Sequence, residues 1–92
     1  MTRVHLVISG RVQGVFFRQS SVNFAASNAV DGWVRNRPDG TVELVAQGAG
    51  DDVERFVDWC RKGPEMANVT SVERTYAEPV TMPMGFHVRP TA

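Results

Sequence analysis

The sequence predicts an α+β fold in which two helices pack on one face of an antiparallel sheet. Three observations lead to this prediction. Apolar and polar residues alternate in several short segments, as in half-buried strands, and two other segments carry apolar residues at helical spacing. Turn-forming residues separate these segments. Their order along the chain is β-α-β-β-α-β, and 92 residues are the length of one domain, 1-92.

The first strand is predicted near the start of the chain, where three apolar residues alternate with others: Val4, Leu6 and Ile8. Val7 makes the opposite face partly apolar too, so we expect this strand in the middle of the sheet. A loop bracketed by Gly10 and Gly14 follows it. The first helix should begin close to Arg18 and stop near Asn28. Its apolar residues fall on one helical face: Val22, Ala25, Ala26 and Ala29.

A β-hairpin is predicted after this helix. Val30 to Arg37 and Thr41 to Gln47 have the composition of two strands. Pro38-Asp39-Gly40 between them favours a turn, because proline presets one dihedral and glycine accepts a positive one.

The second helix is expected to begin at Asp51 as its cap, with Glu54 completing a capping box. Its predicted apolar face consists of Val53, Phe56, Val57 and Cys60. Gly63-Pro64 should end it. A fourth strand is predicted from Val69 to Tyr76, and Phe86 to Arg89 could add a short fifth one. This order of elements is that of a ferredoxin-like βαββαβ two-layer sandwich, in which one face of the sheet is partly exposed to solvent.

The composition is that of an ordinary globular protein. Hydrophobic residues make up 42% and charged residues 22%, and the formal net charge is zero. A balanced charge does not favour general binding to nucleic acid or to a membrane surface. The apolar run at the start is too short for a signal sequence or a membrane span. Cys60 is the single cysteine, so neither a disulfide nor a cysteine-rich zinc site is expected. We therefore expect a cytoplasmic protein.

The segment from Gly10 to Arg18 has the parts of an anion site. Successive backbone N–H groups of a glycine-bracketed loop can surround an anion, and a helix start adds unpaired donors. Arg18 adds a positive charge and a planar fork that matches two phosphate oxygens. A cation at a helix start is unfavourable for the helix by about 0.3–1 kcal/mol unless an anion binds there. The same residues also fit a tight loop with a solvated arginine, so the pattern alone leaves both interpretations open.

Two longer motifs resemble those of a known family. Residues 10–18, GRVQGVFFR, resemble the acylphosphatase motif G-x-V-Q-G-V-x-F-R. Residues 32–43, GWVRNRPDGTVE, resemble the second acylphosphatase motif, G-W-V-R-N-x-x-D-G-x-V-E. Four further matches follow in the second half of the chain: Phe56, Trp59, Gly63-Pro64, and Ala67 with Val69. The resemblance covers nearly the whole chain.

The resemblance implies hydrolysis of acyl phosphates, a small-molecule substrate class, without a metal or another cofactor. It implies that Arg18 holds the phosphate and that Asn36 positions the attacking water. The loop amides would cradle the same phosphate: Val12, Gln13, Gly14, Val15, Phe16 and Phe17. We expect a monomer. The chain departs from the family at Asn28-Ala29, where an apolar residue and a glycine are usual, and we expect Asn28 to adopt the left-handed conformation in place of that glycine.

Two other functions remain as alternatives. A non-catalytic phosphate- or ligand-binding module would share both motifs. An RNA-binding module of the same fold would need an aromatic-rich strand, but Thr41 to Gln47 has no aromatic residue. His5 and His87 lack the spacing of a triad or a metal site, so we interpret both as structural or exposed. Cys60 is interpreted as a core residue. Aromatic packing is expected of three residues: Phe17, Trp33 and Trp59.

Overall fold

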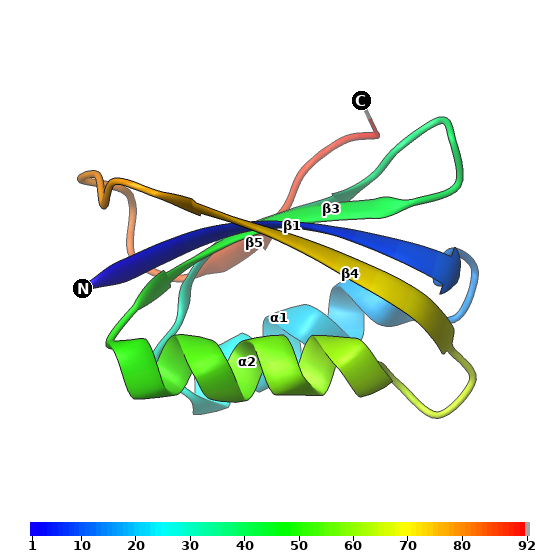
Figure 1. The fold of residues 1–92 in the computed structure, drawn as a ribbon, viewed down its shortest axis with the longest axis horizontal. Helices are drawn as coiled ribbons and strands as arrows, with labels where there is room; N and C mark the ends of the chain where they lie inside the picture. Colours follow the sequence, from blue (N-terminus) through cyan, green and yellow to red (C-terminus); the bar gives the residue numbers. More distant parts are fainter. Residues whose placement is uncertain (92) are drawn as a thin grey trace.

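The computed structural model describes residues 1–91, which form five strands and two helices. In chain order these are β1 (Thr2–Arg11), α1 (Phe17–Ser27), β2 (Asp31–Asn36), β3 (Val42–Gly48), α2 (Gly50–Lys62), β4 (Asn68–Ala77) and β5 (Phe86–Val88). Every predicted helix and strand is present, the short fifth strand included. Both helices cover the same face of the sheet (Figure 1), as in a ferredoxin-like α+β fold. Neither helix in this part of the chain is long and apolar enough to span a membrane.

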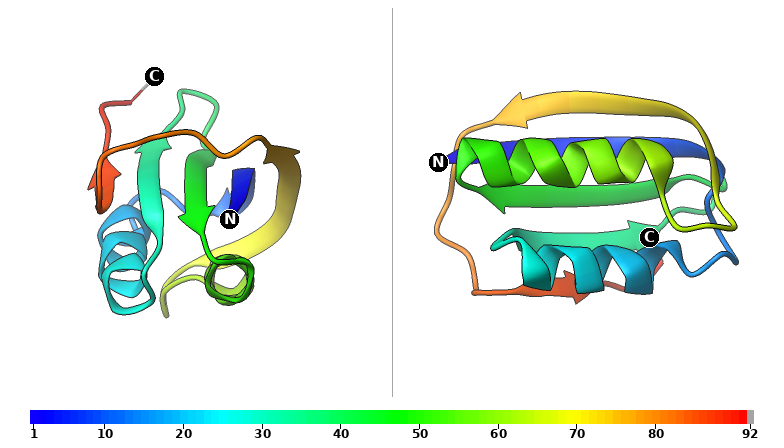
Figure 2. Two further views of the ribbon diagram at one scale, coloured as in Figure 1. Left: turned by 90° about the vertical axis from the view of Figure 1, so that its left-hand side faces the viewer. Right: turned by 90° about the horizontal axis from the view of Figure 1, so that it is seen from below.

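The strands are arranged in the order β4-β1-β3-β2-β5. β1 therefore lies inside the sheet, between β4 and β3, as its two apolar faces predict. The four main strands pair antiparallel, as predicted, and the short fifth strand β5 adds to one edge parallel to β2. The connection over residues 78–85 crosses one end of the sheet from β4 to the opposite edge (Figure 2). β5 therefore starts at the same end of the sheet as β2 and runs in the same direction.

The core lies between the sheet and the helices. Alternate residues of the two central strands are buried against the helices: Val4, Leu6, Ile8, Val42, Leu44 and Ala46. The predicted apolar face of α2 is confirmed, since all four of its residues are buried: Val53, Phe56, Val57 and Cys60. This alternation makes the register of β1 on β3 specific, because a shift by one residue would expose every core side chain of the strand.

The helix α1 buries the predicted face only in part, since Ala25 is buried and Val22 packs partly buried against the core. Its buried residues lie four apart along the chain: Phe17, Ser21 and Ala25. Ala26 and Ala29 are exposed instead. Phe24 packs against Trp59 and Phe56 of α2, with ring centroids 5.4 Å and 6.1 Å apart. Aromatic rings bury much more apolar area than alanine methyl groups, so they determine the rotation of the helix.

The predicted capping box of α2 is wrong. The helix begins at Gly50, after an extended Ala49, and no side chain caps it. Asp51 lies inside the first turn, where its charge still interacts favourably with the helix dipole. Glu54 accepts a hydrogen bond from Nη1 of Arg74 in β4, at 2.6 Å, so its carboxylate is not directed to the helix start.

The end of α1 also differs from the expectation. Asn28 has a negative φ of −127°, and Ala29 is the residue in the left-handed conformation, with φ 55°. The Asn28 side chain donates from Nδ2 to the carbonyl of Phe24, at 2.9 Å, and so satisfies a carbonyl at the helix end. The other predicted helix stop is confirmed, because Gly63 closes α2 with φ 70°.

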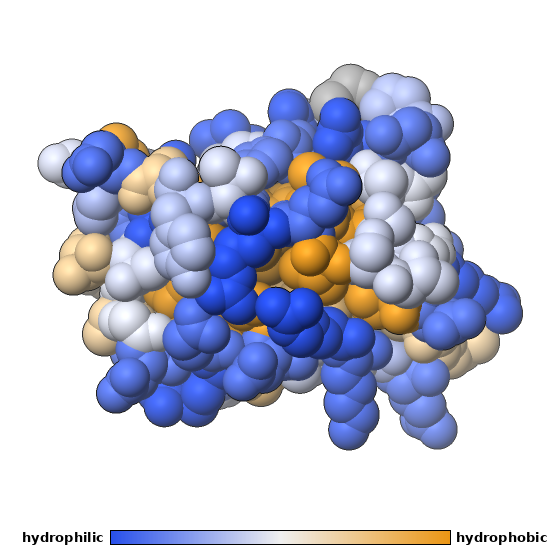
Figure 3. Space-filling view, in the orientation of Figure 1, coloured by the Kyte–Doolittle hydropathy of each residue, from blue (hydrophilic) through white to orange (hydrophobic). Residues whose placement is uncertain are grey.

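The face of the sheet away from the helices is partly covered. The connection over residues 78–85 packs on one end of it, where Gln47 and Val80 form two hydrogen bonds, of 2.7 Å and 3.1 Å. Polar side chains dominate the rest of that face, in agreement with the prediction of a partly wet surface. The β4 and α2 side of the molecule is also mainly hydrophilic, with an apolar area near the middle of β4 (Figure 3).

Candidate active site

The loop between β1 and α1 has an unusual backbone. Gly14 and Phe16 both have left-handed dihedrals, with φ 74° and 63°, and Val15 lies between them. Such alternation turns successive N–H groups toward one side, which produces an anion-binding concavity. Glycine adopts this conformation freely, whereas an aromatic residue adopts it only against a strain of about 1–3 kcal/mol. Strain of this size is typical of functional loops.

The amides of this loop are available to a ligand. None of the backbone N–H groups of residues 13–16 donates a hydrogen bond to another backbone group within residues 1–91. The helix α1 begins directly afterwards at Phe17, with no acidic residue in its first turn and no side-chain cap. Unpaired donors and the positive end of the helix dipole therefore coincide, which favours an anion at this point.

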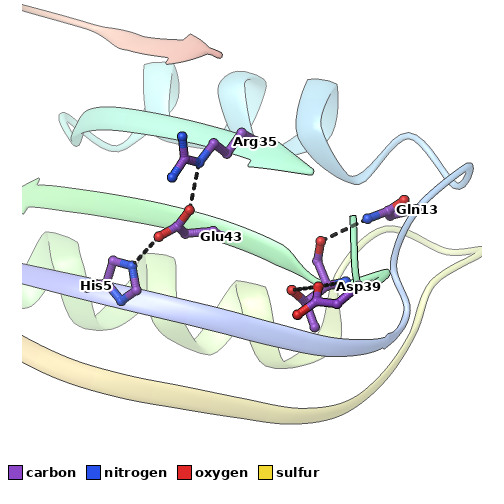
Figure 4. Close-up of polar contacts among 6 residues, drawn as sticks. His5, Gln13, Arg35, Asp39 and Glu43 are labelled. Atoms are coloured by element: carbon purple, nitrogen blue, oxygen red, sulfur yellow. Dashed lines mark hydrogen bonds and ion pairs between the residues drawn. The ribbon is translucent and has the colours of Figure 1, made fainter. Parts of the chain in front are cut away.

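The side chain of Gln13 holds the loop against the turn between β2 and β3. Its Nε2 donates to the carbonyls of Arg37 and Thr41, both at 2.9 Å. Figure 4 shows Gln13 directed toward the turn that contains Asp39. Asp39 stabilises that turn, because its Oδ1 accepts from the amide of Thr41 at 3.0 Å and from Oγ1 of Thr41 at 2.6 Å. These hydrogen bonds lower the pKa of Asp39. The interpretation of Asp39 as a turn residue is confirmed.

A cavity of about 520 Å³ lies beside the loop. Eight residues line it: Val12, Gly14, Phe16, Phe17, Arg18, Gln19, Asn36 and Val88. The structure thus brings Arg18 of α1 and Asn36 of β2 to one cavity with most of the predicted loop. Arg18 is half-buried and pairs with no carboxylate in the described part of the chain.

Asn36 reaches the cavity because it is the last residue of β2. Strand alternation places it on the helix-covered face with Gly32 and Val34, opposite Val42 of β3. Its Oδ1 is enclosed and accepts no hydrogen bond within residues 1–91. An unsatisfied enclosed acceptor costs about 1–3 kcal/mol, so its presence in a cavity wall indicates a function rather than a contribution to stability.

Two predicted loop residues do not line the cavity. Gln13 is directed to the β2–β3 turn, and the side chain of Val15 is buried in the core. Two other residues do line it that sequence reasoning missed. Gln19 follows Arg18 directly, so its position next to the motif was an available signal. Val88 comes from β5, and no local signal links it to a loop so distant along the chain.

A second polar group lies on the open face of the sheet and not on the cavity. Glu43 accepts from Nε2 of His5 at 2.7 Å and from Nε of Arg35 at 2.6 Å (Figure 4). Partial burial raises the pKa of Glu43. The two hydrogen bonds and the charge of Arg35 lower it by more than burial raises it, so the pKa lies below its usual value. Trp33 contacts the guanidinium groups of Arg35 and Arg89, 5.1 Å and 4.5 Å from its ring centroid. His5 is therefore a structural residue, as interpreted, whereas Trp33 packs against arginines and not in the core.

Among residues 1–91, no three His, Cys, Asp or Glu side chains gather into a group that could hold a metal ion. Three chemical features meet at the cavity instead: free backbone donors, the guanidinium of Arg18, and the carboxamides of Gln19 and Asn36. These features suit the binding of a phosphoryl group and the orientation of a water molecule.

Known proteins resemble this chain along nearly its entire length. The family model for acylphosphatase matches residues 4–88. An acylphosphatase from Haloarcula marismortui is 49% identical over 88 residues, 96% of this chain and 96% of that protein. The structure of an acylphosphatase from Bacillus subtilis has a TM-score of 0.92 at 31% identity and covers 97% of this chain and 99% of its own. An acylphosphatase from Coxiella burnetii has a TM-score of 0.89 at 40% identity, with 96% and 92% covered. Since the family model spans both motifs and includes part or all of every strand, this chain belongs to the acylphosphatase family.

Proposed function

We propose that the cavity beside Arg18 is where this chain hydrolyses acyl phosphates to a carboxylate and inorganic phosphate. The amides of residues 12–17 and the guanidinium of Arg18 bind the phosphoryl group. The carboxamide of Asn36 orients the attacking water. The observation that carries this proposal is that Arg18, Asn36 and the strained loop line one cavity, although they come from different elements.

The reaction requires little from the protein beyond positioning and charge. The water oxygen bonds to phosphorus, the bond from phosphorus to the acyl oxygen breaks, and the carboxylate leaves with the electron pair. A carboxylate is a good leaving group, so no general acid is needed. Binding the phosphoryl oxygens with fixed donors, and holding the water in line, therefore accounts for the main catalytic effects.

No residue in this mechanism acts as a base. An arginine side chain stays protonated and a carboxamide does not titrate, so neither Arg18 nor Asn36 can take the proton of the water. His5 does not line the cavity and is bonded to Glu43. A phosphoryl oxygen of the substrate accepts the proton in this proposal, which makes the reaction substrate-assisted.

The test compares the wild type with Asn36→Ala in the hydrolysis of benzoyl phosphate, with a chelator present. We expect the wild type to keep its activity in the chelator. The variant should lose turnover by about a hundredfold, the scale of one lost positioning group, while inorganic phosphate still inhibits it at similar concentrations. Its stability should be unchanged or higher, because the substitution removes an unsatisfied enclosed acceptor.

Asn68→Ala is the matched control, since Asn68 is exposed at the start of β4 and does not line the cavity. It should leave turnover unchanged. A folded Asn36→Ala protein that no longer binds phosphate would show that the division of roles is wrong. A wild type that hydrolyses no acyl phosphate would refute the proposed function.

A further inference from the structure

The wall of the cavity combines two chemistries. Arg18, Asn36 and the loop amides are polar, but Phe16 and Val88 are apolar, and their exposed fractions are 76% and 46%. Phosphoryl oxygens gain nothing from contact with an aromatic ring or a valine. An acyl phosphate carries a second part, its acyl group, which is the part that an apolar wall can bind.

Phe16 is an unexpected residue for its position. Its backbone is left-handed at φ 63°, where glycine or asparagine would be unstrained. Its ring is mostly exposed, so it recovers little of that strain by packing in the core. An exposed aromatic side chain held by a strained backbone at the edge of a cavity indicates a ligand contact.

Val88 comes to the cavity from a different element, β5. In β5 the alternation puts Phe86 and Val88 on the same face, and Phe86 is buried against Phe56 with ring centroids 5.2 Å apart. Val88 lies one strand step further on, paired with Val34, and lines the cavity without being covered by the core. The docked strand β5 therefore supplies an apolar side chain to a site that is otherwise built by the β1–α1 loop, α1 and β2.

We propose that Phe16 and Val88 form an acyl-recognition rim, which makes this enzyme prefer acyl phosphates with aromatic or other bulky apolar acyl groups over acetyl phosphate. The inference rests on the proposed function and names the substrate class of the same site. A cavity of about 520 Å³ lies within the range of sites that enclose organic ligands, and is larger than a phosphoryl group alone requires.

The test measures kcat/KM for benzoyl phosphate and for acetyl phosphate, and uses their ratio. Both substrates share the phosphoryl group. A change in phosphoryl binding therefore alters kcat/KM for both substrates by the same factor, which cancels in the ratio. We expect Val88→Thr, which keeps the shape of the side chain, and Phe16→Asn, which suits the left-handed backbone, each to lower the ratio by about three- to tenfold. This is the order expected when about 25–50 Å² of apolar contact is lost. The loss should be found mainly in KM for benzoyl phosphate.

Two further variants sharpen the result. Phe16→Tyr keeps the ring and should keep the ratio. Val80→Thr makes the same change as Val88→Thr at a valine that is 49% exposed but does not line the cavity, and it should leave both substrates unaffected. An unchanged ratio in both Val88→Thr and Phe16→Asn would overturn the rim while leaving the hydrolase intact. A wild type inactive on both substrates would instead refute the proposed function, and the rim with it.

Discussion

Arg18 is the one guanidinium that lines the cavity in the described part of the chain, and it has no carboxylate partner there. It also lies in the first turn of α1, where a positive charge destabilises a helix. Both facts support the proposal that Arg18 binds an external anion. A planar guanidinium can donate two parallel hydrogen bonds to a phosphoryl group, whereas an ammonium cannot.

We therefore expect Arg18→Lys to lower kcat/KM for benzoyl phosphate by about a hundredfold, although the charge is kept. Arg11→Lys is the matched control, because Arg11 is exposed at the end of β1 and does not line the cavity. It should change kcat/KM by less than about twofold, an effect within the usual range for surface substitutions. Equal activity in the two variants would show that Arg18 supplies only a general positive field.

Glu43 provides a test of electrostatics outside the cavity. Its folded-state pKa is lower than its unfolded-state pKa, so folding favours the ionised carboxylate. The resulting stability is complete above the unfolded-state pKa and is lost as the pH falls through the folded-state pKa. We expect Glu43→Gln to lower the free energy of unfolding by about 1–2 kcal/mol at pH 7, and by progressively less below about pH 4.

Urea denaturation of the wild type and Glu43→Gln at several pH values measures this difference. Glu73→Gln serves as the control, because Glu73 is exposed on β4 and forms no ion pair within residues 1–91. A difference between wild type and Glu43→Gln that does not depend on pH would contradict the assignment of the hydrogen bonds with His5 and Arg35 to the ionised carboxylate.

The helix α1 ends at Ser27, and the chain leaves it through a left-handed residue, Ala29. Alanine is unfavourable in that conformation. Ala29 has φ 55°, a conformation that costs an alanine about 1 kcal/mol and a glycine almost nothing. Asn28 was expected to adopt it, but its side chain donates to the carbonyl of Phe24 and keeps a negative φ. The positive dihedral is therefore needed one residue later, at the position where the family usually has glycine.

Ala29→Gly should accordingly raise the free energy of unfolding by about 0.5–1 kcal/mol and Tm by a few degrees. Ala26 is exposed inside α1. Ala26→Gly should lower the free energy of unfolding by a similar amount, since glycine weakens a helix interior. Thermal denaturation of both variants measures the pair. If Ala29→Gly is destabilising to the same extent as Ala26→Gly, the left-handed conformation at residue 29 is wrong.

The molecule as a whole is held by one core between the sheet and the two helices. Cys60 can be used to measure how often this core opens. Its thiol is fully buried on the inner face of α2, and burial raises the pKa of that thiol. Only an exposed thiolate reacts with a disulfide reagent. The reaction therefore requires opening of the core, and hence unfolding of most of the molecule.

We expect labelling of Cys60 by a chromogenic disulfide to be at least about a thousandfold slower in the native protein than in urea-unfolded protein at the same pH. The unfolded sample is the control for intrinsic reactivity. Labelling of the native protein at the unfolded rate would place Cys60 in a locally opening region and not in the core.

Much of the fold was predictable because its signals are local. Strand alternation around Leu6 and the helical spacing around Phe56 each depend on residues a few positions apart, and both correctly identified buried faces. Gly40 and Gly63 marked chain reversals through their tolerance of positive φ. In α1 the same reasoning was right for Val22 and Ala25 only, because alanine spacing carries little free energy compared with the packing of Phe24 on α2.

The candidate site divides in the same way. Arg18 and Asn36 stand out in the sequence through their motifs. The composition of the loop between Gly10 and Gly14 fits an anion site but fits a plain tight loop equally well. The position of Val88 was not predictable, because it depends on the parallel docking of β5 against β2.

The sequence alone was sufficient to predict the number and type of elements, the glycine-bracketed loop before α1 and the family, since each is encoded within short stretches of chain. Packing in three dimensions decided the rotation of α1, the direction of β5 and the apolar side of the cavity. The physical reason is that these features arise from contacts between segments far apart in the chain, whose free energies are summed only when the whole molecule folds.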